Sequence, residues 1–210
     1  MTAEALKHLS RDKVMKKLIR EVGPCGLVPQ AKRSPFESLV RAVAHQQLHA
    51  TAAGRILERF CALFPGKRFP SPAHLAAVSD EQLRAVGFSG SKSAAIRDIA
   101  AKALEGIVPT SRAIAKLDDA DIVERLIAVR GVGRWTVEML LIFQLGRPDV
   151  LPADDFGVRT GFQLCFGLAD LPKPKELLAY GECWRPYRTT AAWYLWRAAD
   201  RKAKSKKVDK

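Results

Sequence analysis

The chain has 210 residues, of which 48% are hydrophobic, enough for one large domain or two small ones with a real core. Its 35 Lys and Arg residues against 22 Asp and Glu give a net charge of +13 at pH 7 and a pI near 9.9. The last ten residues hold six basic and one acidic side chain, so they carry +5 and leave +8 on the rest. That excess favours a polyanionic partner, nucleic acid before an anionic membrane.

Several classes of protein are excluded. The chain has no run of about 18 apolar residues that could span a membrane, and residues 1–20 interleave charged with apolar side chains, unlike a signal peptide. The four cysteines form no CxxC pair, which argues against a zinc site or an iron–sulfur cluster. We therefore expect reduced thiols in an intracellular protein.

The pattern of apolar residues predicts helices along the whole chain. Helical spacing is clear over residues 14–22 and 122–127, and Gly and Pro residues separate such segments. Ser34, with Pro35 and Glu37 behind it, predicts a helix cap, a Pro at the first helical position and a capping-box acid; residues 79–82 predict a similar start. We expect about ten helices, no strand, and a basic disordered tail over residues 201–210.

A Gly-Val-Gly sequence, residues 131–133, stands between two predicted helices. Glycines permit positive φ and close backbone approach, so the loop can turn its amide N–H groups outward toward a phosphate, beside the N-terminus of the next helix. A plain helix-turn-helix connection explains the same pattern. The five apolar residues 139–143 predict that the second helix is buried, which would anchor the hairpin on a rigid element.

Two adjacent acids, Asp154 and Asp155, precede the next predicted helix. Their first interpretation is helix capping, which accounts for one of them. The Asp-Phe-Gly triplet over residues 155–157 is not a kinase motif here, because the chain lacks a His-Arg-Asp loop and a glycine-rich ATP loop. A Walker sequence, a GxSxG elbow and an HExxH pair are absent from the sequence as well.

These motifs resemble those of the helix-hairpin-helix superfamily of DNA glycosylases, most specifically its 3-methyladenine DNA glycosylase II branch. The resemblance covers roughly residues 5–200 and rests on five ordered matches: Arg41–Leu48, Gly87–Lys92, the hairpin with Arg134–Thr136, Leu151–Asp155, and Trp184–Trp196.

The resemblance implies an all-α helix-hairpin-helix glycosylase fold over residues 1–200. We expect N- and C-terminal helices that pack together, a central helical bundle at about 34–145, and an active site in the cleft between two helical subdomains. We do not expect the N-terminal β domain of the longest members, which 210 residues are too few to contain. By family position Asp155 is the catalytic carboxylate and Asp154 the helix cap, and Trp135 replaces the Lys of the members that also cut the backbone.

The resemblance also assigns the DNA-contacting and substrate-contacting positions. Gln47 or Leu48 is expected to fill the gap left by a flipped base, and His49 to contact the minor groove; ordinary core and surface positions are the alternatives. The substrate pocket is expected to contain Trp135, Trp196 and Phe156, whereas core positions are favoured for Trp193 and Tyr194. The expected contacts of the hairpin with DNA come from Gly131, Val132, Gly133, Arg134 and Thr136.

The implied function is a base-excision-repair glycosylase that flips alkylated purines out of duplex DNA and hydrolyses the glycosidic bond without cutting the strand. No cofactor is needed, although a Na⁺ or K⁺ at the carbonyls of Val129 and Gly131 stays open. The alternatives are a noncatalytic DNA-binding module and a glycosylase for mismatched or oxidised bases. We expect a monomer with no membrane partner, in the cytoplasm with the nucleoid or in a eukaryotic nucleus.

Overall fold

The computed structural model describes the backbone of residues 2–208 and the side chains of residues 2–49 and 51–202. This part of the chain contains thirteen α-helices, one 3-10 helix and no strand, which confirms the all-α prediction. The helices exceed the expected ten because three are single short turns, over Pro72–Ala76, Asp80–Ala85 and Ser111–Ile114, too short to show a period. The chain folds into two compact units, one of residues 1–29 and 146–210 and the other of residues 30–145.

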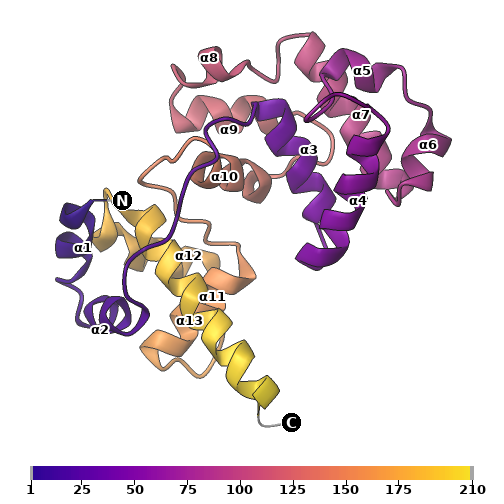
Figure 1. Ribbon diagram of the computed structural model, residues 1–210. Helices are drawn as coiled ribbons and strands as arrows, with labels where there is room; N and C mark the ends of the chain where they lie inside the picture. The colour runs from indigo at the N-terminus through magenta and orange to yellow at the C-terminus, as the bar shows by residue number, and fades with distance from the viewer. Residues whose placement is uncertain (1, 209–210) are drawn as a thin grey trace. The chain divides into compact units, whose positions relative to one another are not determined.

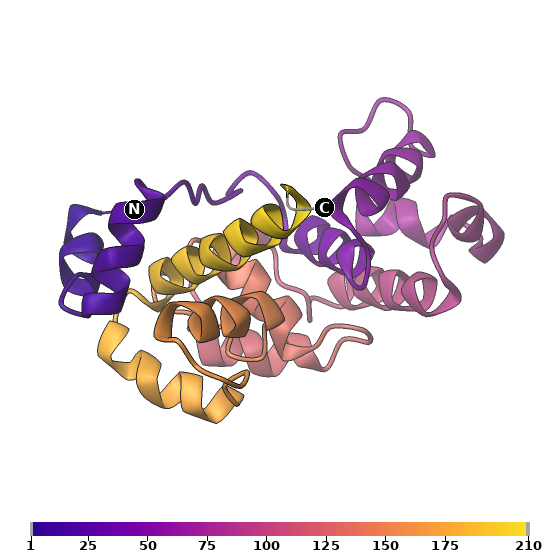
Figure 2. The same cartoon turned by 90° about the horizontal axis from the view of Figure 1, so that it is seen from below.

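The first unit joins both ends of the chain, and its elements are drawn in indigo and in orange to yellow (Figure 1). They are α1 (Ala3–Leu9), α2 (Lys13–Val22), α11 (Phe156–Phe166), α12 (Pro174–Gly181), η1 (Glu182–Trp184) and α13 (Arg188–Val208). The long helix α13 packs against α11 and α2. Figures 1 and 2 both show it beside α11. The hydrophobic core of this unit contains Trp193 and Tyr194, which confirms the core interpretation of these two aromatics.

Asp12 ties the N-terminal helices of this unit to its C-terminal part. One carboxylate oxygen caps α2 by accepting from the N–H groups of Val14 and Met15 at 2.8 and 3.2 Å. The other accepts from the Tyr180 hydroxyl and the Trp184 indole N–H, each at 3.0 Å. The same side chain therefore begins α2 and links it to residues of the C-terminal part that lie far away in the sequence.

The second unit is built around α7 (Gly90–Leu104), which packs against α3, α5 and α6. Its elements are α3 (Pro35–His45), α4 (Ala50–Ala62), α5 (Pro72–Ala76), α6 (Asp80–Ala85), α7, α8 (Ser111–Ile114), α9 (Asp119–Ile127) and α10 (Arg134–Phe143). Phe36, Phe60, Ile96 and Ile99 are among the buried side chains of its core. Helix α10 packs against α3 and α9, so the loop before α10 has support from both sides.

Three local predictions hold and one does not. Pro35 is the first residue of α3, as predicted. Ser34 caps α3 through the Glu37 N–H at 3.1 Å, and Ser79 forms a full capping box with Gln82. Glu37 does not act as a capping-box acid. Its buried carboxylate instead forms ion pairs with Arg41 at 3.0 Å and Arg68 at 2.7 Å, because two guanidinium groups compensate its desolvation better than one backbone N–H.

The prediction of a disordered tail is wrong for residues 201–208, which continue α13. Lys, Arg and Ala are good helix formers, and extending a helix that is already anchored requires no new nucleation. Residues 209 and 210 of the expected tail lie outside the described residues.

Gly161 sets the close approach of α11 to α13. A Cβ atom at this position would collide with the backbone carbonyl of Leu195. Gly161→Ala is therefore expected to lower the free energy of unfolding by roughly 1 to 3 kcal/mol, measured by urea denaturation. Gly54→Ala, in α4, is the matched control: nothing lies within 4 Å of its added Cβ, and it is expected to stabilise by about 0.5–1 kcal/mol. Equal effects of the two variants would contradict this account of the contact.

Candidate active site

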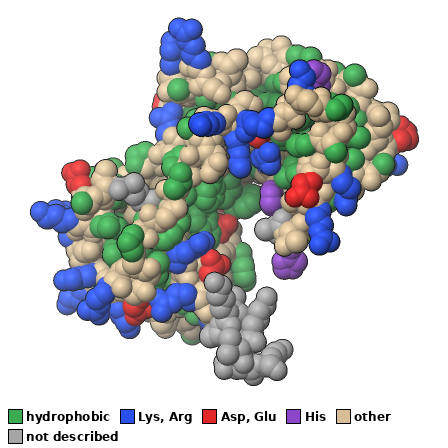
Figure 3. All heavy atoms as spheres, viewed as in Figure 1, with side chains coloured by type: hydrophobic (Ala, Val, Ile, Leu, Met, Phe, Trp, Pro, Cys, Tyr) green, Lys and Arg blue, Asp and Glu red, His purple; other side chains and the backbone are tan. Residues whose placement is uncertain are grey.

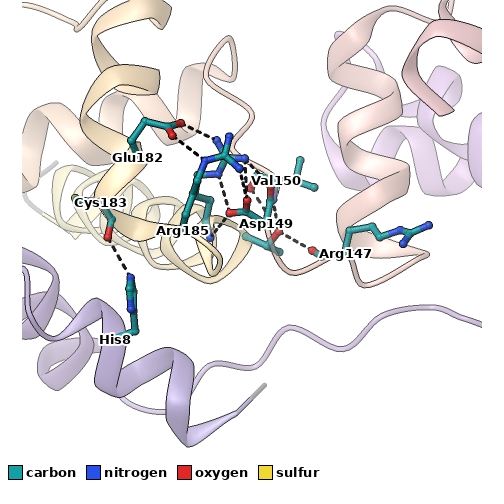
Figure 4. Close-up of polar contacts among 9 residues, drawn as sticks. His8, Arg147, Asp149, Val150, Glu182, Cys183 and Arg185 are labelled. Atoms are coloured by element: carbon teal, nitrogen blue, oxygen red, sulfur yellow. Dashed lines mark hydrogen bonds and ion pairs between the residues drawn. The ribbon is translucent and has the colours of Figure 1, made fainter. Parts of the chain in front are cut away.

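The segment that leads to Asp155 is held by the start of α13. Arg188 binds Asp149 through two parallel hydrogen bonds, Nε to Oδ1 at 2.7 Å and Nη2 to Oδ2 at 3.0 Å. Arg185 adds a third hydrogen bond to Asp149 at 2.7 Å (Figure 4). The Thr189 hydroxyl donates to the carbonyl of Arg147 at 2.7 Å and accepts from the N–H of Val150 at 2.9 Å. Residues 147–150 therefore have little freedom, and the buried residues 151–153 follow directly.

Asp155 is the N-cap of α11. Its Oδ1 accepts the N–H of Val158 at 2.8 Å, and its own N–H donates to the Pro152 carbonyl at 3.0 Å. The expectation that Asp154 caps this helix is wrong: the turn from Pro152 to Asp155 makes Phe156 the first helical residue, so the capping position falls to Asp155 and the side chain of Asp154 is exposed.

A second donor reaches the same carboxylate from α13. The indole N–H of Trp196 donates to Asp155 Oδ1 at 2.8 Å. Gly157 makes room for this contact, since a Cβ there would lie 2.9 Å from Trp196 Cδ1 and 3.1 Å from Asp155 Oδ1. Asp155 thus has a fixed orientation at the positive end of α11, where negative charge is stabilised. The resemblance placed Trp196 in the substrate pocket, and its contact with the carboxylate could not be seen in the sequence.

The hairpin joins α9 to α10 in the other unit. Gly131 has φ +76°, and an added Cβ would lie 2.6 Å from the Ala95 Cβ, so this position requires glycine on two grounds. Gly133 is the N-cap of α10 and makes no side-chain cap hydrogen bond. The N-cap residue itself therefore supplies no side-chain acceptor to the first turn of α10, which is compatible with a phosphate-binding helix start.

The remaining hairpin residues differ in what they expose. Val132 is buried and its N–H donates to the Val129 carbonyl at 3.0 Å, while Thr136 is buried with its hydroxyl accepting from Gln46. Arg134 is exposed and paired with Glu138 at 3.2 Å. Of the five residues expected to contact DNA here, only Gly131, Gly133 and Arg134 are exposed.

Trp135 lines a cavity of about 310 Å³ within the second unit. Arg33, Arg41, His45, Met139 and Phe143 also contribute to its wall. No sequence pattern indicated the two arginines, because Arg33, just before α3, and Arg41, within α3, become pocket residues only when α3 packs on α10. Phe156, the third expected pocket residue, is 72% exposed at the start of α11.

The loop between α3 and α4 carries the residues expected to enter the duplex. Gln47, Leu48 and His49 are all exposed, Leu48 to 40% of its surface. Gln47 has φ +55° and is the single non-glycine residue with positive φ in residues 2–208. His49 is the N-cap of α4 without a side-chain cap hydrogen bond, so its imidazole is not engaged in closing that helix.

Both units are basic. Residues 30–145 contain 16 Lys and Arg against 11 Asp and Glu, a net charge of +5, and the remaining residues contain 19 against 11, a net charge of +8. Lys and Arg side chains are visible on both units in the space-filling view (Figure 3). Attraction to a polyanion therefore does not depend on one unit alone.

The cysteines, the possible metal ligands and the apolar helices also bear on what the protein can do. The four cysteines are free, and burial raises the pKa of the Cys165 thiol to about 11, so it stays protonated at neutral pH. Among the described residues no group of three or more His, Cys, Asp and Glu could hold a metal ion, and no described helix has the length and apolarity needed to cross a bilayer.

His45 is expected to make the fold sensitive to acid. Burial lowers its pKa from the ordinary 6.5, with smaller contributions from Arg41, Lys92 and Arg33. Above pH 6.5 the imidazole is neutral in both states; as the pH falls toward its lowered pKa, the unfolded chain takes up the proton first and stability is lost. The melting temperature of His45→Gln should thus fall less than that of the parent between about pH 7.5 and about pH 5.5. Parallel losses would contradict a lowered His45 pKa.

Comparison with known proteins agrees with this architecture. Residues 40–186 match the model of the HhH-GPD superfamily of base excision DNA repair proteins. The chain belongs to this family, which confirms the resemblance that the motifs indicated.

Named relatives include 3-methyladenine glycosylases from a yeast and a bacterium. DNA-3-methyladenine glycosylase 1 of Schizosaccharomyces pombe is 41% identical over 91% of this chain and 85% of its own length. The structure of the 3-methyladenine DNA glycosylase of this yeast in complex with abasic DNA has a TM-score of 0.86 and covers 93% of this chain and 96% of that one. A DNA-3-methyladenine glycosidase from Bacillus halodurans has a TM-score of 0.84 at 33% identity, covering 97% of this chain and 92% of that one.

Proposed function

We propose that this protein is a monofunctional DNA glycosylase that flips alkylated purines out of duplex DNA and hydrolyses their glycosidic bond, with Asp155 as the catalytic carboxylate. The observation that carries the proposal is the double fixation of Asp155 Oδ1 by the Val158 N–H and the Trp196 indole, each at 2.8 Å. A helix cap needs only the first of these bonds. The second is what a carboxylate with a defined orientation toward a substrate requires.

The proposed reaction needs few catalytic groups besides this carboxylate. Alkylation at N3 or N7 of a purine makes the base cationic, so the C1′–N bond breaks with its electron pair moving to the base and a general acid is not needed. A carboxylate near the sugar stabilises the oxocarbenium-like transition state. It then accepts a proton from the water that adds to C1′, leaving free base and an abasic sugar.

The strand is proposed to remain intact. Cleavage by relatives with lyase activity uses a Lys just after the hairpin as a Schiff-base nucleophile, and Trp135 occupies that position here. The Trp135 indole lines the cavity described above, where a flat, cationic base can stack. We propose Trp196 and Phe156 as further pocket residues, Trp196 with its ring edge engaged by Asp155.

DNA is proposed to be held through its backbone. The amides of the exposed residues Gly131 and Gly133 and the start of α10 would bind one phosphate, with Arg134 beside it. Gln47 or Leu48 would fill the space of the flipped nucleotide, and His49 would contact the minor groove. The protein would act on double-stranded DNA as a monomer.

A monovalent cation at the hairpin is compatible with the backbone carbonyls there. The Val129 carbonyl accepts from the Val132 N–H at 3.0 Å, and the Gly131 carbonyl from Gln46 Nε2 at 3.0 Å. Each carbonyl oxygen keeps a second lone pair, so both could also bind Na⁺ or K⁺. The ion would add positive charge toward the phosphate and take no part in bond cleavage.

Asp155→Asn is the first test. Purified parent and variant are incubated with methylated duplex DNA; free bases are measured by chromatography, and strand breaks with and without hot alkali. We expect the parent to release methylated purines and to give breaks only after alkali, and the variant to release them at least about a hundredfold more slowly because the amide cannot stabilise the cationic sugar. Binding of both proteins to DNA without release by either would instead favour a noncatalytic DNA-binding module.

Trp196→Phe tests the second donor separately. It keeps an aromatic ring but removes the N–H that binds Asp155 Oδ1, together with part of the ring volume, a loss of volume that the control below shares. We expect kcat to fall by about tenfold, the loss of one hydrogen bond to a charged acceptor, with unchanged affinity for DNA containing an abasic-site analogue. Trp193→Phe, at the neighbouring buried aromatic, is the matched control and should leave kcat within about twofold. Equal losses in the two variants would assign the effect to packing.

A further inference from the structure

The C-terminal end of α3 is held by a lysine from another helix. The Lys92 ammonium, in the first turn of α7, donates to the carbonyl of Ala44 at 2.9 Å and to that of Gln46 at 2.8 Å. These carbonyls lie where α3 ends and the loop of residues 46–49 begins. A partly buried ammonium is costly unless it is hydrogen-bonded, so these two acceptors hold both the lysine and the loop in place.

The first residue of the same loop is bound to the hairpin. Gln46 Nε2 donates to the Gly131 carbonyl at 3.0 Å and to the Thr136 hydroxyl at 3.3 Å. Gly131 stands in the turn before α10, and Thr136 is a buried residue of its first turn. One side-chain amide therefore connects the loop that would enter the duplex with the hairpin that would bind phosphate.

The residue that follows these two anchors has an unfavourable backbone conformation. Gln47 has φ +55°, in the left-handed region that is unfavourable for a non-glycine residue, and the Leu48 N–H closes the turn on the His45 carbonyl at 3.3 Å. A free loop would relax from this conformation. Because Ala44, Gln46 and Lys92 are fixed relative to each other, Gln47 and Leu48 stay exposed in one shape.

We propose that Gln46 and Lys92 are positioning residues that hold the loop of residues 46–49 in its duplex-entering shape before DNA binds, with Gln46 coupling this loop to the hairpin. The proposal rests on the proposed function and adds to it the means by which base flipping is prepared. A preformed loop loses no conformational freedom when it enters the duplex, so the interactions it makes there contribute fully to opening the base pair.

The test compares a base that must be unpaired with one that is already unpaired. Gln46→Leu and Lys92→Met each remove the donors and keep side-chain bulk. Their rates of 7-methylguanine release are measured on a duplex with the base opposite cytosine and on one with it opposite an abasic-site analogue. We expect a loss of about tenfold or more on the paired duplex, the value of one or two hydrogen bonds of this kind, and less than about threefold on the unpaired one.

Arg59→Met is the matched control, because Arg59 Nε donates to the Val86 carbonyl at 2.9 Å, at the end of α6 in the same unit. This variant removes a cation from a helix end that does not carry the loop. Base release from the two duplexes should therefore slow equally or not at all. Melting temperatures of the three variants show whether a rate change reflects partial unfolding.

A second readout does not depend on base release. DNA with 2-aminopurine opposite an abasic-site analogue should fluoresce more strongly when the loop of the parent enters and unstacks the probe, and the increase should be at least about threefold smaller with Gln46→Leu or Lys92→Met at saturating protein. Equal losses on paired and unpaired duplexes, or fluorescence like that of the parent, would overturn the positioning role. A parent that unstacks the probe but releases no base would refute the proposed chemistry and leave the positioning role supported.

Discussion

The hydrogen bond between the Trp196 indole and Asp155 depends on how closely two helices approach. Gly161 lets α11 lie against the backbone of α13 at Leu195, and Gly157, one turn earlier, leaves space for the indole of the next residue of α13. Asp155 begins α11 and so meets that indole at 2.8 Å. A larger side chain at either glycine would separate the helices and remove the second donor from the carboxylate.

The carboxylate of Asp155 combines a structural with a proposed chemical role. As the N-cap it stabilises α11, and as the proposed catalytic group it must present its negative charge to a sugar. The two roles do not conflict, because both need the same fixed orientation, and the network of Asp149, Arg188 and Thr189 fixes the chain immediately before it. The rigidity of the site thus comes from ordinary helix-end and ion-pair interactions.

The features proposed to grip and open the duplex belong to one unit and support each other. Gln46 joins the loop after α3 to the hairpin, and Lys92 joins it to α7, the central helix of that unit. A mobile loop would bind DNA through charge alone, which the basic surface of both units already provides. A loop fixed by hydrogen bonds to three carbonyls and a buried hydroxyl keeps its conformation on contact with a base pair. The base pair, not the loop, is then expected to change conformation.

The sequence alone determined the helical class, the hairpin and the family, because helix periodicity, glycine requirements and motif spacing are local properties of the chain. Through the family resemblance it also singled out Asp155 and Trp135 as candidate site residues. It could not decide which of two adjacent acids caps α11, or that Glu37 pairs with arginines, since both depend on where the chain turns and what packs there. The contacts of Trp196 with Asp155 and of Gln46 with Gly131 join residues 41 and 85 positions apart. Only tertiary packing brings such residues within hydrogen-bonding distance, and no local pattern records it.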